Sequence, residues 1–269
     1  MGKYFVTHGE EVSGFYSRTL NSAKEAAQFC DTKHFKELDS LIEVSDTLFL
    51  TVTDGAIQEV WDCIAAKDVK GKLICHFSGS LSSDIFSNAE QAGVSVCSLH
   101  PIYAFSNKFT AYHNLTEAIF TVEGDRRAVA EIQRMFKKLP NRLVPIKTEA
   151  KMRYHAAVSM ASNHVIGLLS IAVGMLEEAG VEREAACEML SPLVKNNVEA
   201  AFEYGCVEAL TGPIERNDIG TVRHHLEVLS EEQKAVYEAI GTELVKISEK
   251  KHTERNYKQM EELLRKESE

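Results

Sequence analysis

Short apolar runs alternate with helix-length amphipathic segments along residues 12–146, and this alternation constrains the fold more than any other feature. The apolar runs are predicted strands, and they read EVSGFYS, DTLFLTV, GKLICHF, GVSVCSL, EAIFTVE and NRLVPI. The segments between them are predicted helices, at residues 20–31, 55–67, 81–92 and 125–138. Strands and helices at this spacing indicate an α/β fold, in which helices cover a mostly parallel sheet.

The second half of the chain lacks strand patterns and is predicted to be all-helical. The segment EAKMRYHAAVSMASNHVIGLLSIAVGMLEEAG fits one long helix ending at a glycine, and residues 182–204 and 231–265 fit further helices. The proline-containing segment KKLPNRLVPIKTE is the best domain boundary. We therefore expect an α/β domain at residues 1–147 and a helical domain at residues 148–269.

Composition excludes several classes of function. A formal net charge of −10 without a basic stripe disfavours nucleic acid and anionic membranes as partners. No apolar run approaches a membrane span and no leader opens the chain, so we expect a cytoplasmic protein. The six cysteines form no C-x-x-C pair, and His76 and His100 lack partners at ligand spacing. We expect neither a disulfide framework nor a metal site.

The turn after the first predicted strand carries Ser17, Arg18 and Thr19 and no acidic residue. In a dinucleotide-binding sheet, the second strand ends in an acid for the NAD ribose, or in arginine and small hydroxyl residues for the NADP 2′-phosphate. If EVSGFYS is that strand, this turn predicts NADP as the cofactor. The alternative is a surface arginine in a turn where Thr19 or Asn21 caps the next helix.

Polar, turn-forming residues also follow three other predicted strands, at the edge where open parallel sheets bind ligands. These residues are Thr53 and Asp54, then Ser78, Gly79 and Ser80, then His100 and Pro101. Three such ends together favour a cofactor site. Each of these residues taken singly fits a structural role equally well. In the same way, Ser82 or Ser83 could simply cap the following helix.

Two further segments are candidates for the substrate. Lys151, His155 and Ser162 lie within about 40° of one line on the predicted long helix, although a solvent-facing Lys and His would show the same spacing. The second segment, ALTGPIERNDIGTVRHHL, concentrates more turn-forming and polar residues between two helices than a plain connection needs, among them Thr211, Gly212, Pro213 and Arg216.

The motifs HFSGS, SLHPIYAF, KMRYHAAVSMASNH and ALTGPIERNDIGTVRHHL together resemble one family. It consists of NADP-dependent oxidoreductases that join a Rossmann-like domain to a helical domain of unknown function, family 2520. More distantly, the chain is similar to the 6-phosphogluconate and β-hydroxyacid dehydrogenases, ketopantoate reductase and pyrroline-5-carboxylate reductase. In those dehydrogenases a helix carries K-x-x-x-N with a general acid/base lysine. This chain keeps the lysine, as Lys151, and has His155 in place of the asparagine.

The resemblance implies an oxidoreductase that passes hydride between NADP and a small carbonyl, hydroxyl or imine compound. Lys151 would transfer the proton, and His155 and His100 would be polar contacts on the substrate side. Ser162, Asn163 and the residues of the 211–221 loop would complete the substrate site. The helical domain would form a homodimer.

The resemblance also implies a strand and a glycine-rich turn ahead of MGKYFVTHGEEV, where this sequence begins. Without the glycine turn we expect weak binding of the pyrophosphate. Two alternatives therefore stay open. One is a protein that senses a nucleotide or metabolite without catalysis, and the other is a truncated chain without affinity for the cofactor.

Overall fold

The computed structural model describes residues 1–105, 107 and 109–265 and consists of two compact units. The first unit is Met1–Ser162 and the second is Asn163–Glu269. The division falls inside the long helix, later than the domain boundary expected after residue 147, because the first turns of that helix pack with the sheet.

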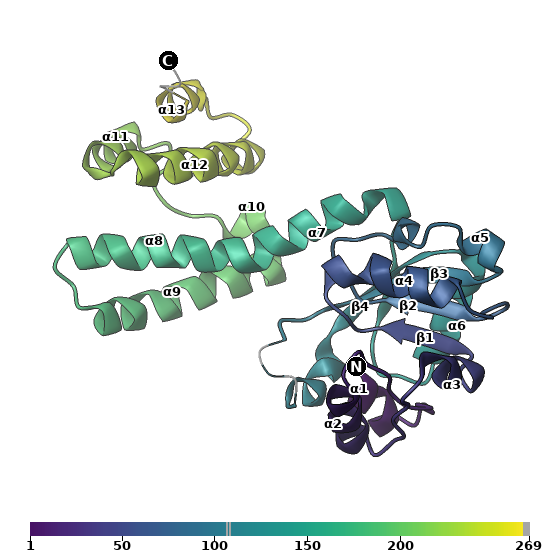
Figure 1. The fold of residues 1–269 in the computed structure, drawn as a ribbon. Coiled ribbons are helices and arrows are strands. Elements are labelled where there is room, and N and C mark those ends of the chain that lie inside the picture. The colour runs from purple at the N-terminus through teal and green to yellow at the C-terminus, as the bar shows by residue number, and fades with distance from the viewer. Residues whose placement is uncertain (106, 108, 266–269) are drawn as a thin grey trace. The chain divides into compact units, whose positions relative to one another are not determined.

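A five-stranded sheet forms the centre of the first unit, and its strands follow chain order from one edge to the other. They are β1 (Thr47–Leu50), β2 (Leu73–His76), β3 (Ser95–Ile102), β4 (Ile119–Gly124) and β5 (Leu143–Pro145). Only the β3–β4 pair is antiparallel, and the other three pairs are parallel (Figure 1). The expected Rossmann-like, mostly parallel α/β fold followed by a helical region is confirmed.

Both faces of the sheet are covered by helices whose apolar residues recur every three or four positions. Helix α4 (Ile57–Ala65) buries Ile57, Trp61 and Ile64, and α6 (Arg126–Phe136) buries Ala128, Ile132 and Phe136. Successive residues of a strand point to opposite faces, so Ile74 of β2 packs in the cluster with α4 and Cys75 in the cluster with α6. Tyr4 and Phe5 join the α6 cluster from α1 (Gly2–Thr7).

The remaining helices of the first unit are shorter or lie outside these two layers. They are α2 (Leu20–Cys30), α3 (Leu38–Glu43), α5 (Ala89–Ala92) and α7 (Lys151–Ser159), together with single 3₁₀ turns at Asp54–Ala56, Ser83–Ile85, Ala111–His113, Leu115–Glu117 and Thr148–Ala150. The helix predicted at 81–92 is therefore divided into the 3₁₀ turn Ser83–Ile85 and the short helix α5. Asn88 interrupts it with a left-handed φ of 58°.

The strand predicted at residues 12–18 is wrong. Phe15 makes one isolated parallel bridge to His34, and the described sheet ends at β1. A strand is defined by a ladder of hydrogen bonds to a neighbour, and this segment has only the bonds of Phe15 to Lys33 and Phe35. Its apolar residues fit the pattern of a strand, but no neighbouring strand of the described structure forms a ladder of hydrogen bonds with them.

The second unit is helical throughout its described residues. It contains α8 (Val165–Glu178), α9 (Arg183–Tyr204), α10 (Cys206–Ala209), α11 (Ile219–Val228), α12 (Glu231–Lys251) and α13 (Lys258–Leu264). The predicted helix at 231–265 is thus two helices, separated at residues 252–257. A π-helical turn, Met160–His164, links α7 to α8 within the long helix Thr148–Glu178.

That long helix is apolar and poorly covered. By length and composition alone it is one helix that could cross a membrane, and 6% of its most apolar window is buried. This corrects the expectation that no apolar segment reaches such a length. Single helices of this kind also occur in soluble proteins, so the finding is weak evidence for a membrane.

Candidate active site

Lys151, the first residue of α7, points its ammonium group into the first unit beside the polar ends of β2, β3 and β4. Its side chain is 1% exposed, and Nζ donates a hydrogen bond of 2.7 Å to Oγ of Ser98 on β3. Burial lowers the pKa of this lysine, while the negative charge of Glu123 acts in the opposite direction. A buried lysine with a lowered pKa can release and regain a proton nearer to neutral pH than a surface lysine.

Ser98 continues the network from Lys151 toward the loop after β2. Its hydroxyl donates to the carbonyl of Ser78 at 3.3 Å, and the Ser78 hydroxyl donates to Oδ2 of Asp54 at 2.7 Å. Ser80 donates to the same carboxylate oxygen at 2.9 Å. Ser98 and Ser78 therefore link the Lys151 ammonium group to the exposed Asp54 carboxylate, with the Ser78 carbonyl and the Ser78 hydroxyl each making one of the hydrogen bonds.

His76 at the end of β2 holds the loop that carries Ser78. The backbone N–H of Ser78 donates to Nδ1 at 3.1 Å, so the ring proton lies on Nε2, which faces the carbonyl of Ser82 at 3.2 Å. The ring is fully buried, and burial lowers its pKa to about 4. This neutral imidazole gives the turn at residues 78–82 its shape.

His100 lies on β3 two residues beyond Ser98 and pairs with α7. Its Nδ1 is 2.7 Å from the hydroxyl oxygen of Tyr154, which also accepts a hydrogen bond from Thr121 of β4 at 3.1 Å. Burial lowers the pKa of His100 to about 4, and its neighbours Lys151 and His155 act in the same direction. Burial also raises the pKa of Tyr154.

Gly79 separates the two imidazoles of His100 and His155. A methyl group on its Cα would lie 2.7 Å from Cδ2 of His155 and 2.8 Å from Nε2 of His100. The two rings are 6.4 Å apart between centroids. Any side chain at position 79 would therefore collide with both rings.

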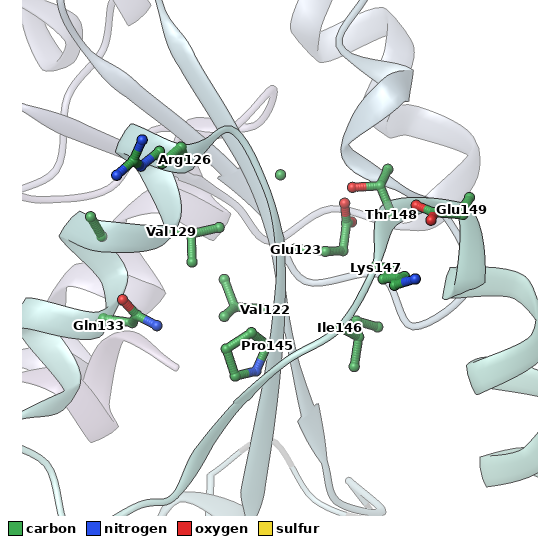
Figure 2. A pocket seen from close by; sticks show the side chains of 12 residues that line it. Val122, Glu123, Arg126, Val129, Gln133, Pro145, Ile146, Lys147, Thr148 and Glu149 are labelled. Carbon is green, nitrogen blue, oxygen red and sulfur yellow. The ribbon is translucent and has the colours of Figure 1, made fainter.

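A cavity of about 550 Å³ in the first unit lies beside this cluster. It is bounded by β4, α6, β5 and the turn before α7, and Figure 2 shows Glu123 and Thr148 on its wall. The Glu123 carboxylate is 1% exposed and accepts hydrogen bonds from the Ser83 amide at 2.9 Å and the Ser83 hydroxyl at 2.8 Å. Glu123 thus fixes the second half of the β2 loop.

The structure divides the predicted cofactor residues into two groups. Asp54 and Ser78 are joined by the hydrogen bond above, Gly79 follows Ser78, and Thr53 is an exposed residue just before Asp54. Ser17, Arg18 and Thr19 follow the isolated bridge, and no described contact joins them to Asp54. Thr19 is the N-cap of α2, where it accepts from the Ser22 amide at 3.4 Å, as the capped-turn alternative predicted.

The predicted substrate residues are not joined to this cluster by the described contacts. Ser162 donates to the carbonyl of Val158 and lies in the π-helical turn. In a π-helix each hydrogen bond spans five residues instead of four, so the residues after this turn no longer lie on the helix face of Lys151. Asn163 is the exposed first residue of the second unit. The expectation of one shared face for Lys151, His155 and Ser162 therefore holds only for the first two.

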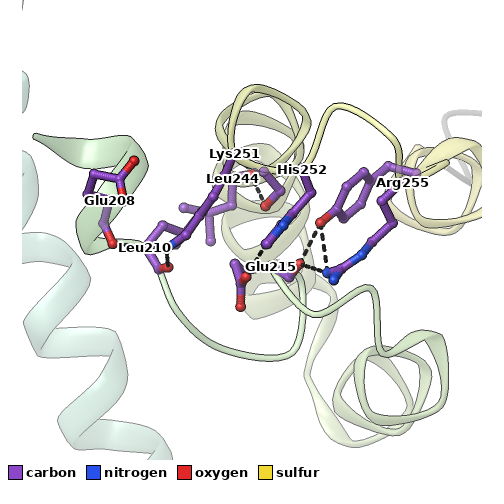
Figure 3. A network of polar contacts seen from close by, with 9 residues as sticks. Glu208, Leu210, Glu215, Leu244, Lys251, His252 and Arg255 are labelled. Carbon is purple, nitrogen blue, oxygen red and sulfur yellow. Dashed lines mark hydrogen bonds and ion pairs between the residues drawn. The ribbon is translucent and has the colours of Figure 1, made fainter.

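The loop with Thr211, Gly212, Pro213 and Arg216 belongs to the second unit and is held by the residues after α12 (Figure 3). Arg255 donates to the Glu215 carbonyl at 2.8 Å, Tyr257 donates to the same oxygen at 2.5 Å, and the Glu215 carboxylate pairs with His252. Lys251 donates to the Leu210 carbonyl at 2.9 Å. These contacts give the turn-forming residues of this loop a structural role within the second unit.

Sequence reasoning missed Ser98, Thr121, Glu123 and Tyr154, and it treated His76 only as a metal candidate. Ser98 and His100 alternate with apolar residues on β3, and Tyr154 lies one helical turn after Lys151, so periodicity carried a signal for them. Thr121 and Glu123 carried none, because their partners Tyr154 and Ser83 lie 33 and 40 positions away in the sequence. Among the described residues no group of three or more His, Cys, Asp or Glu could hold a metal ion.

Comparison with known proteins agrees with the fold. Residues 118–244 match a family described as a domain of unknown function (DUF2520), which confirms the expected resemblance over that range. The motifs KMRYHAAVSMASNH and ALTGPIERNDIGTVRHHL lie inside the matched range, and HFSGS and SLHPIYAF lie outside it. No curated protein matches the chain in sequence.

Solved structures with the same fold cover almost the whole chain. Protein TM1727 from Thermotoga maritima is 22% identical with a TM-score of 0.72, covering 88% of this chain and 90% of its own. BF3122 from Bacteroides fragilis, a candidate NADP oxidoreductase, is 21% identical with a TM-score of 0.69, covering 94% and 93%. A variant imine reductase from Myxococcus stipitatus in complex with NAD⁺ is 14% identical with a TM-score of 0.60, covering 98% and 94%. These TM-scores establish a shared fold.

Proposed function

We propose that this chain is an NADP-dependent oxidoreductase that transfers a hydride between the cofactor and a small carbonyl, hydroxyl or imine compound. The observation that carries the proposal is the buried ammonium group of Lys151, which lies among polar strand ends and beside two imidazoles. The fold shared with a candidate NADP oxidoreductase and an imine reductase supports the same reaction class.

Bound NADP would supply the hydride, and the residues of the first unit suit its recognition. Asp54 and Ser80 present a carboxylate and a hydroxyl at the carboxyl ends of β1 and β2, where parallel sheets bind nucleotides. Arg18 is exposed, has no acidic neighbour in the sequence and can pair with a 2′-phosphate. We assign Ser17, Arg18 and Thr19 to that phosphate, and Thr53, Asp54, Ser78 and Gly79 to the remainder of the cofactor.

Lys151 is the proposed proton-transferring residue. An ammonium group has three N–H donors, and the contact with Ser98 uses one of them. The lowered pKa brings the lysine nearer to the working range of a general acid/base. His100 and His155 would orient the substrate, since neutral imidazole can donate from one nitrogen while the other is held by the protein. For Ser162, Asn163, Thr211, Gly212, Pro213 and Arg216, a role in substrate binding stays a prediction from the family resemblance.

The second unit is the proposed dimerisation surface. Helix α9 exposes apolar residues on opposite sides, with Leu193 57% exposed and Phe202 89% exposed, and Ile166 of α8 is 69% exposed. A helix that is apolar on several sides is normally covered. Two copies packed through α8 and α9 would cover these side chains. Sedimentation should give a dimer, and Phe202→Glu should give a monomer, whereas a monomeric parent chain would refute this part of the proposal.

The free cysteines support a reducing compartment. All six cysteines are free, and three of them, at positions 63, 187 and 206, are exposed. Free exposed thiols suit a reducing compartment, and we propose that the protein acts in the cytoplasm.

Absorbance at 340 nm tests the reaction directly. The full-length protein would be mixed with NADPH and a panel of small cyclic imines, ketones and aldehydes, and oxidation of NADPH dependent on one of these compounds supports the proposal. Binding of NADPH without turnover of any compound in either direction would instead favour a sensor protein. No binding of NADPH or NADH would refute a role in nicotinamide chemistry.

A further inference from the structure

We infer that Tyr154 is a positioning residue that holds His100 in the tautomer with its proton on Nε2. Three hydrogen-bonding groups from three different elements meet at the Tyr154 hydroxyl. Tyr154 comes from α7, His100 from β3 and Thr121 from β4, and the Tyr154 oxygen is within hydrogen-bond distance of both partners.

The direction of the hydrogen bonds decides the tautomer. The Thr121 hydroxyl lies 3.1 Å from the Tyr154 oxygen and 3.5 Å from the His100 carbonyl, and we assign its single proton to the shorter contact, with Tyr154. The phenolic proton of Tyr154 is then directed at Nδ1 of His100, at 2.7 Å, and Nδ1 accepts it. An imidazole that accepts at Nδ1 and is neutral carries its own proton on Nε2.

The neutral form of His100 is secured by its surroundings. The titratable and charged groups that act on it are Tyr154, His155 and Lys151 of α7 and Asp54 after β1. Burial, then Lys151 and His155, lower its pKa to about 4, against the weaker effect of Asp54. At neutral pH the ring is therefore uncharged, and its tautomer is the remaining variable.

The Nε2–H group of His100 faces Gly79 and the ring of His155. Nε2 lies next to Gly79, since a methyl group added there would be 2.8 Å away, and His155 borders the same space. The ring of His100 is partly exposed, unlike that of His76. Tyr154 thus presents a neutral N–H donor beside Lys151, suited to a carbonyl oxygen or a hydroxyl group of a substrate. This use in the reaction rests on the proposed function, but the tautomer does not.

Nitrogen NMR of protein labelled with ¹⁵N-histidine tests the tautomer without cofactor or substrate. At pH 7.5 the parent should show His100, assigned by loss of its signals in His100→Gln, with a protonated Nε2 and an unprotonated Nδ1. Tyr154→Phe should move the two nitrogen shifts toward each other, as the two tautomers exchange. Thr121→Val should do so to a smaller extent, and the matched control Tyr112→Phe should leave the signals of His100 unchanged.

Two results would overturn the inference: a parent His100 protonated on Nδ1, or nitrogen shifts unaffected by Tyr154→Phe in a variant with a native circular dichroism spectrum. Once a substrate is known, Tyr154→Phe should lower kcat about tenfold with an unchanged dissociation constant for NADPH. If the NMR result holds and no turnover exists, the positioning role stands and the proposed function fails. The two claims are therefore separable.

Discussion

The Nζ atom of Lys151 lies 2.7 Å from Oγ of Ser98, and both side chains are almost completely buried. The lysine starts α7 and the serine lies in the middle of β3, so one short hydrogen bond ties the beginning of the long helix to the sheet. The same contact places the only fully buried lysine among the described residues next to the Ser78 loop.

Replacing Lys151 should separate catalysis from cofactor binding. Lys151→Met keeps the length of the side chain and removes the ammonium group, so turnover should fall by about 10²- to 10⁴-fold while the affinity for NADPH stays the same. Steady-state kinetics and fluorescence titration give the two quantities. Retained turnover in a folded variant would show that another group moves the proton, and a loss of affinity without any turnover in the parent would favour the sensor.

Arg18 should decide between the two nicotinamide cofactors. A charge-assisted contact with the 2′-phosphate contributes roughly 1.5–3 kcal/mol, so Arg18→Ala should weaken NADPH binding about ten- to a hundredfold and leave NADH binding unchanged. Lys24→Ala is the matched control, because it also removes one positive charge, from the exposed face of α2. Equal losses in the two variants would indicate general electrostatics and contradict a specific role of Arg18.

Gly79→Ala should damage the site through contact alone. The added methyl group would meet His155 and His100 at 2.7 and 2.8 Å, and such overpacking typically costs about 1–3 kcal/mol. Urea unfolding should show this loss. Gly55→Ala is the control, because nothing lies within 4 Å of its added methyl group. If both variants unfold at the same urea concentration as the parent, the close approach of the two imidazoles is not present in solution.

His76 should make the first unit sensitive to mild acid. Its pKa in the folded protein is about 4, below the usual 6.5, so the unfolded state binds more protons between these values. Its contribution to stability is complete above pH 6.5 and is lost as the pH falls toward 4, by up to about 3 kcal/mol. His76→Gln can still accept from Ser78 and donate to Ser82, but it does not titrate. Urea midpoints from pH 4.5 to 7.5 should therefore fall less steeply in the variant, and parallel curves would exclude this role.

Glu215 should carry a different acid sensitivity in the second unit. Its hydrogen bond to His252 holds the pKa of this carboxyl below its usual value. A lowered carboxyl pKa gives stability that is present above about pH 4.3 and is lost as the pH falls through the folded value. Glu215→Gln should lower the melting temperature at pH 7 and flatten its acid dependence. Glu227→Gln, on the exposed side of α11, is the control, and identical melting curves for the two variants would refute the prediction.

The sequence by itself determined most of the secondary structure, because helix and strand patterns depend on residues that are close together in the chain. The spacing of Ala128, Ile132 and Phe136 predicted α6, since residues four apart share a helix face, and Thr19 could be recognised as an N-cap from its own side chain. The apolar runs at β1 to β4 predicted strands for the same reason. The shared helix face of Lys151 and His155 also followed from helix geometry, because the two residues lie four positions apart.

Tertiary structure decided what depends on a partner from elsewhere in the chain. Residues 12–18 had a strand pattern, but a strand exists only when a neighbour completes its hydrogen bonds, and the described structure gives Phe15 a single bridge. The contact of Tyr154 with His100 joins residues 54 positions apart, and that of Lys151 with Ser98 joins residues 53 apart. Burial at that meeting point, and not the residue types themselves, lowers the pKa values of His100 and Lys151, because desolvation depends on everything that packs around a charge.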